Sequence, residues 1–149
     1  MTQSYSVGYK ELLIVITLLV LFPMALILPL IINYTGGIFT YSLDDPYIHL
    51  ALAKNIWMGN YGINLNEPSA PSSSILWPFL LAPFSFFSGF FEFVPLIINV
   101  CCLGLLVFAM DKAFSDLKLL SRLTLIAVIL IALNAYGLVF TGMEFSATH

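Results

Sequence analysis

Long apolar blocks separated by short polar segments constrain this chain more than any other feature. Residues 12–33 and 123–140 are almost entirely apolar, and so is most of the stretch 75–110. About 20 apolar residues in a helix are enough to cross the hydrocarbon core of a bilayer. Only 9% of the 149 residues are charged, whereas a soluble domain carries roughly a quarter. The sequence therefore predicts an all-α, polytopic membrane protein.

Breaks within the middle apolar stretch predict how many times the chain crosses. This stretch is too long for one simple span, and Ser88, Gly89 and Pro95 interrupt it. We assign one crossing to residues 93–110 and a shorter interfacial or half-inserted helix to residues 75–87. With the two outer blocks this gives about three transmembrane helices. Three spans make a poor independent bundle, so we expect the chain to be the N-terminal part of a longer protein.

The distribution of basic residues predicts the orientation in a plasma membrane. Residues 111–122 form a polar loop that carries three of the five basic residues, Lys112, Lys118 and Arg122. Short loops rich in Lys and Arg are normally cytoplasmic. Lys10 precedes the first span and places the N-terminus on the same side. The polar segment 34–74 is then external, and the last span returns to the external face.

Two adjacent carboxylates open the polar segment DDPYIHLALAKNIW just after the first span. The Asp45-Pro46 pair predicts a helix start, because Asp caps helices and Pro is favoured at the first helical position. Residues 46–58 then read as a helix with Ile48, Leu52 and Ile56 along one face. We expect this helix to lie on the membrane surface.

Carboxylates beside a bilayer are costly unless they are solvated, paired or used. Capping would explain Asp45, but it leaves Asp44 unexplained. In the functional interpretation one carboxylate is a general base or a metal ligand, and the other orients it or raises its proton affinity. Two adjacent acids can also hold a divalent cation that bridges a phosphate. The sequence therefore favours Asp44 as the base.

Three further residues are candidates for binding a substrate. His49 follows Asp45 by one helical turn, where it can orient a carboxylate or bind a phosphate oxygen. Its alternative role is an interfacial histidine that is hydrogen-bonded to a neighbour. Lys54 can neutralise a lipid phosphate or simply extend to the head groups. Glu144 follows the last span and, by the predicted orientation, lies on the same external side as the Asp pair.

Three segments in order carry a resemblance to a known family. They are YSLDDPYIHLALAKNIWMGNYGIN, EPSAPSSSILWPFLLAP and TGME. Together they resemble the N-terminal part of GT-C superfamily glycosyltransferases, bacterial and archaeal members related to arabinofuranosyl- and mannosyltransferases. These enzymes are polytopic, take their sugar from a polyprenyl phosphate, and carry an acidic motif in the first external loop.

The resemblance implies a role for each candidate residue. Asp44 would be the base toward the acceptor hydroxyl of a glycan, lipid or protein, and Asp45 its partner. His49 and Lys54 would lie near the donor phosphate or the acceptor, and Glu144 near the cavity. The sugar would be transferred with inversion at its anomeric carbon. The residues that select donor and acceptor would lie outside this chain.

Two alternatives from other classes stay open. A small non-catalytic membrane subunit would explain the length, but it has no need of the acidic and TGME motifs together. Part of an ion- or proton-coupled transporter would carry acids within its spans, whereas here they cluster at the external boundary. No basic patch is present, so the sequence gives no indication of a nucleic-acid partner.

Overall fold

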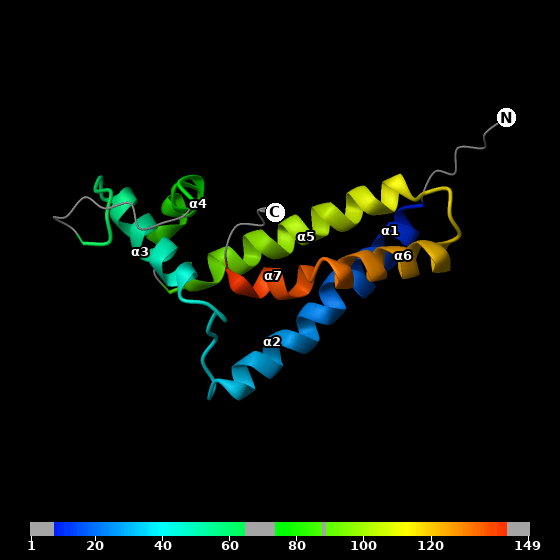
Figure 1. Ribbon diagram of the computed structural model, residues 1–149, viewed down its shortest axis with the longest axis horizontal. Coiled ribbons are helices and arrows are strands. Elements are labelled where there is room, and N and C mark those ends of the chain that lie inside the picture. Colours follow the sequence, from blue (N-terminus) through cyan, green and yellow to red (C-terminus); the bar gives the residue numbers. More distant parts are fainter. Residues whose placement is uncertain (1–7, 65–73, 88, 143–149) are drawn as a thin grey trace. The chain divides into compact units, whose positions relative to one another are not determined.

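The structure is a computed structural model that describes residues 8–64, 74–87 and 89–142. Every regular element in these ranges is a helix, as Figure 1 shows. The chain divides into two compact units. One comprises Met1–Thr40 with Val100–Gly137, and the other comprises Tyr41–Asn99 with Leu138–His149. The prediction of an all-helical protein is confirmed.

Two helical segments are long and apolar enough to cross a membrane, Tyr9–Tyr34 and Phe91–Ala113. A third candidate consists of α6 (Leu119–Ala132) and α7 (Ala135–Thr141), if this pair, bent by 51°, is one span. These two to three candidate spans support insertion in a membrane. The orientation and the surface position of the other helices stay predictions. The polar loop expected at 111–122 is shorter, because helices extend into it from both sides.

The first candidate span is one continuous helical stretch with a wider turn inside it. It consists of α1 (Tyr9–Ile16), the π-helical η1 (Thr17–Leu21) and α2 (Phe22–Tyr34). Pro23 has no N–H to donate to the carbonyl of Leu19 four residues earlier. The hydroxyl of Tyr136 donates to this carbonyl at 2.9 Å. The proline is therefore accommodated by a hydrogen bond from another helix, as happens in membrane helices.

The last apolar block is broken, although we expected one uninterrupted helix over residues 123–140. Asn134 lies between α6 and α7 with φ of 48°, in the left-handed region that Asn enters more easily than most residues. A Cβ at Gly137 would lie only 2.5 Å from the side-chain oxygen of Asn134. The small residue three positions later thus makes room for the Asn134 side chain. No proline in the sequence marks this break.

Three charged side chains meet in the unit that contains α1 and α6. The Arg122 Nη2 lies 2.9 Å from Oε2 of Glu11, and its Nε lies 2.8 Å from Oδ1 of Asp111. The Nε–H does not point at the Asp111 carboxylate, so this second contact is an ion pair without hydrogen-bond geometry. Asp111 and Arg122 are buried, at 0% and 1% exposed. Arg122, which the sequence placed in the polar loop, is therefore a buried, paired residue of α6.

Replacing Arg122 with methionine is expected to lower the free energy of unfolding by about 3–5 kcal/mol, because Asp111 would remain buried without its counter-charge. Unfolding of the purified protein in mixed micelles, followed by circular dichroism, measures this loss. The double variant Asp111→Leu with Arg122→Met should recover most of it. A double variant no more stable than the single one would show that the ion pair is not the cause.

The second unit contains the helix that follows the Asp pair. This helix, α3 (Asp45–Trp57), packs against α4 (Leu76–Leu81) and the 3-10 turn η2 (Ala82–Phe86), as Figure 1 shows. A second 3-10 turn, η3 (Phe91–Phe93), leads into α5 (Val94–Ala113). The helices start and end close to the predicted positions.

The buried face of α3 differs from the predicted stripe of Ile48, Leu52 and Ile56. Of these three only Leu52 is buried, and the other two are half-buried. The side chains of α3 that are buried are Pro46, His49, Leu50, Leu52, Ala53 and Asn55. The packing partners α4 and η2 thus cover a face that includes two polar residues. Apolar spacing along α3 did not predict this choice.

Candidate functional site

The Asp pair lies at the start of α3, but the capping interaction that we predicted for Asp45 is wrong. Asp44 occupies the N-cap position with φ −80° and ψ −26°, and its side chain makes no capping hydrogen bond. Asp45 is the first helical residue and Pro46 the second. The backbone carbonyl of Asp44 accepts the N–H of Tyr47 at 3.0 Å. The backbone thus starts the helix without help from either carboxylate.

Both carboxylates are exposed, and neither caps the start of the helix. Neither Asp44 nor Asp45 has a side-chain hydrogen bond or ion pair with any residue in the described ranges. The positive end of the α3 dipole stabilises negative charge at this position. Because capping explains neither residue, the reason for preferring Asp44 over Asp45 as a base no longer holds. Both are equal candidates.

Tyr41 anchors the segment that carries the pair. Its buried hydroxyl donates to the carbonyl of Glu92 at 2.6 Å and accepts the N–H of Leu96 at 3.2 Å. The N–H of Tyr41 donates to the Tyr47 hydroxyl at 3.1 Å, and the two rings meet edge to face at 5.9 Å. The short segment between these tyrosines is thereby fixed at both ends. The Asp pair lies between them.

Burial raises the pKa of the Tyr41 phenol above its ordinary value, and the phenol of Tyr47 and the carboxylate of Glu92 raise it further by repelling a negative charge. The hydrogen bond from Leu96 acts in the opposite direction and is outweighed. Tyr41 therefore stays protonated at physiological pH. It can position its neighbours as a hydrogen-bond donor, but it cannot serve as a base.

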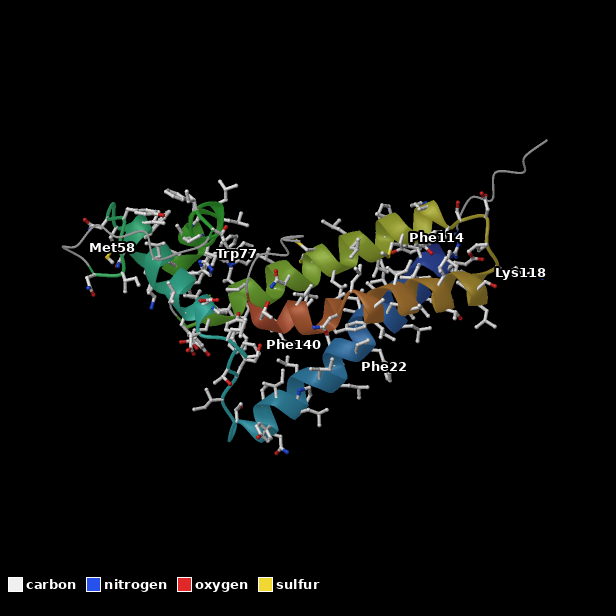
Figure 2. The ribbon with its side chains drawn as sticks, in the orientation of Figure 1. Phe22, Met58, Trp77, Phe114, Lys118 and Phe140 are labelled. Carbon is white, nitrogen blue, oxygen red and sulfur yellow. The ribbon has the colours of Figure 1, made fainter. Side chains whose placement is uncertain are left out.

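Gly142, at the end of α7, fits closely against the same segment. Its φ is 68°, and a Cβ there would lie 2.6 Å from the Tyr41 ring and 2.8 Å from Cγ of Pro46. The indole Nε1 of Trp77, on α4, donates to the Gly142 carbonyl at 3.2 Å. Figure 2 labels Trp77 on α4 and Phe140 near the end of α7. Three segments far apart in sequence thus meet beside the Asp pair.

His49 does not reach the surface where the carboxylates lie. Its side chain is 1% exposed, although the sequence suggested a contact with a substrate. A direct contact would require the surrounding side chains to move. In this structure His49 belongs to the packed face of α3, and its role toward a substrate stays a prediction.

Lys54 is exposed, but it lies far from the pair. It follows Asp45 by nine residues, which corresponds to roughly 14 Å along a helix axis at about 1.5 Å per residue. Its Nζ lies 5.9 Å from the centre of the buried Phe91 ring. Lys54 and the Asp pair therefore lie near opposite ends of α3.

Asn55 is a structural residue that the sequence did not single out. Its buried Nδ2 donates to the carbonyls of Gly62 and Ile63 at 2.6 and 2.7 Å. It thereby holds the segment after α3 against the helix. A polar residue in the last turn of a helix, followed by Gly59 and Gly62, was the available signal.

The last predicted residue, Glu144, lies outside the described residues. Thr141 and Gly142, the first half of the TGME motif, are within them. No group of three His, Cys, Asp or Glu side chains in the described part of the chain is arranged to hold a metal ion. The hypothesis of a bridging divalent cation at the Asp pair stays a prediction.

Comparison with known proteins does not extend this description. The resemblance to GT-C glycosyltransferases inferred from the three sequence segments stays a prediction. No protein-family model, curated protein or solved structure matches the chain.

Proposed function

We propose that this chain belongs to a membrane glycosyltransferase that moves a sugar from a polyprenyl phosphate to an acceptor hydroxyl. The observation that carries the proposal is the exposed Asp44–Asp45 pair, which has no structural partner in the described chain. Support also comes from the buried contacts of Tyr41, Trp77 and Gly142, which hold that pair in place. A rigid support beneath free carboxylates suits a catalytic base.

The proposed reaction transfers one proton to the protein and releases one leaving group from the donor. A carboxylate of the pair removes the proton of the acceptor hydroxyl, and the oxygen attacks the anomeric carbon of the donor sugar. The bond from that carbon to the phosphate oxygen breaks, and the polyprenyl phosphate leaves with the electron pair. Attack from the face opposite the phosphate inverts the anomeric centre. Lys54, on the same helix, would neutralise a lipid phosphate.

A donor panel tests this proposal. The complete reading frame that contains the chain is expressed in cells that lack this protein. Transfer from several radiolabelled polyprenyl-phosphate sugars is then measured in their membranes. We expect transfer from one donor class and none from the corresponding nucleotide sugar. Transfer from the nucleotide sugar alone would contradict the proposal. No transfer from any donor would instead favour the non-catalytic subunit.

The predicted orientation has a separate test. In a background without Cys101 and Cys102, single cysteines are placed at Ser42 and at Ser115. An impermeant maleimide added to intact cells should label Ser42→Cys, which precedes the Asp pair, and leave Ser115→Cys unlabelled until the cells are opened. The reverse pattern would place the Asp pair in the cytoplasm.

A further inference from the structure

A cavity with charged and apolar side chains in its wall lies in the first unit, whereas the Asp pair belongs to the second. It measures about 420 Å³ and is lined by residues of α1, of the α5–α6 connection and of α6 itself. This volume is within the range of about 300–1,000 Å³ that is usual for small-molecule sites. Its polar walls are formed by Glu11, Ser115, Asp116, Lys118 and Arg122.

Charges of both signs face this cavity. Lys118 and Arg122 are cationic, and Glu11 and Asp116 are anionic. Arg122 already has two carboxylate neighbours, Glu11 and the buried Asp111. The four charged side chains of the wall, two cationic and two anionic, carry no net charge together. Lys118 is the cation of this cluster that has no ion-pair partner in the described chain.

The cavity lies at the ends of the apolar helices. The candidate span Phe91–Ala113 ends just before it, and α6 starts at Leu119, on its wall. Glu11 lies at the start of the candidate span Tyr9–Tyr34. Residues at the ends of membrane-spanning helices lie at the level of the lipid head groups. The cavity is therefore placed where a lipid head group can enter it.

We propose that this cavity binds the head group of a zwitterionic phospholipid with a primary ammonium. The Lys118 ammonium would contact the lipid phosphate, and the carboxylates of Glu11 and Asp116 would accept the N–H groups of the lipid ammonium. The Glu11 side chain is 40% exposed and keeps room for such a contact. The phosphate and the ammonium of the ligand would then each contact a side chain of opposite charge.

The same wall discriminates against the other common head groups. A quaternary ammonium has no N–H to donate and is held by aromatic side chains, and none lines the cavity among the residues described. An anionic head group without an ammonium would leave the carboxylates of Glu11 and Asp116 without an opposite charge. The site should therefore prefer a primary ammonium lipid to a choline lipid or a phosphatidylglycerol.

Native mass spectrometry of the purified complete protein, released from nanodiscs, tests this preference. The nanodiscs contain equal amounts of phosphatidylethanolamine, phosphatidylcholine and phosphatidylglycerol. We expect one retained phosphatidylethanolamine per protein. Lys118→Gln and Asp116→Asn, both at exposed positions, should each lower its retention roughly threefold to tenfold. Lys112→Gln is the matched control, because Lys112 belongs to the same region but contacts the Phe108 ring, not the cavity.

The outcomes distinguish a specific lipid site from non-specific electrostatic attraction of lipids. Equal retention of the three lipids would overturn the proposal, and so would an equal loss in Lys112→Gln and Lys118→Gln. Water-soluble glycerophosphoethanolamine should compete only weakly, because it lacks acyl chains. Competition at the same concentration as the lipid would show that the cavity takes a free phosphoethanolamine instead. Wild-type preference with the two selective losses would establish the site.

Discussion

Asp44→Asn is expected to lower the rate of sugar transfer by about 10²–10⁴-fold, the usual contribution of a positioned general base. The substitution keeps the size of the side chain and the backbone carbonyl that starts α3, so folding should change little. Asp45→Asn is predicted to be impaired as well, because the two exposed carboxylates are equal candidates for the base. Initial rates with the preferred donor, at equal amounts of membrane-inserted protein, measure both losses.

Glu92→Gln is the matched control for these two variants. Glu92 is an exposed carboxylate in the same unit, and its hydrogen bond with Tyr41 uses the backbone carbonyl, which the substitution retains. Its activity should therefore equal that of the wild type. Loss in Asp45→Asn alone would assign the base to Asp45, whereas full activity in both Asp variants would refute the proposed catalytic pair.

Gly142→Ala is expected to cost about 2–4 kcal/mol of stability and about 10²-fold in transfer rate. The new methyl group would collide with the Tyr41 ring and with Pro46, at 2.6 and 2.8 Å. These are the residues that hold the Asp pair, so relief of the collision displaces the carboxylates. Thermal unfolding in detergent and transfer assays in membranes measure the two effects.

Gly59→Ala separates crowding from backbone strain. Gly59 also has a positive φ, of 84°, but a Cβ there would meet no atom within 4 Å. The variant should therefore lose only about 1–2 kcal/mol, the cost of the left-handed conformation for a residue with a Cβ, and retain its activity. Equal losses at Gly59 and Gly142 would show that contact with Tyr41 and Pro46 is not what matters.

The lengths of the apolar blocks and the Gly, Pro and polar residues between them predicted the helical class and most helix positions. The start of α3 was within one residue, since Asp45-Pro46 favours a helix start through the fixed φ of proline. The cap itself was not predictable from residue type. Whether a side chain turns back to the backbone depends on its rotamer and neighbouring contacts, which residue type does not specify.

Contacts between distant segments were beyond the reach of the sequence. Arg122 was assigned to the polar loop because no spacing marks its partners, and the partner Glu11 precedes it by 111 residues. Trp77 and Gly142 belong to motifs that the sequence did identify, but their hydrogen bond could not be read from either motif. The inward turn of His49 likewise depends on α4 and η2, which choose the face of α3 that is covered.

The hydrogen bond from Tyr136 to the Leu19 carbonyl has a consequence for how this chain can vary through evolution. It replaces the donor that Pro23 lacks, so the two positions share one requirement. Homologues with an N–H at position 23 are free of that requirement, and phenylalanine would then be as acceptable as tyrosine at position 136. Homologues that keep the proline should keep the hydroxyl, so an alignment should show the two positions changing together.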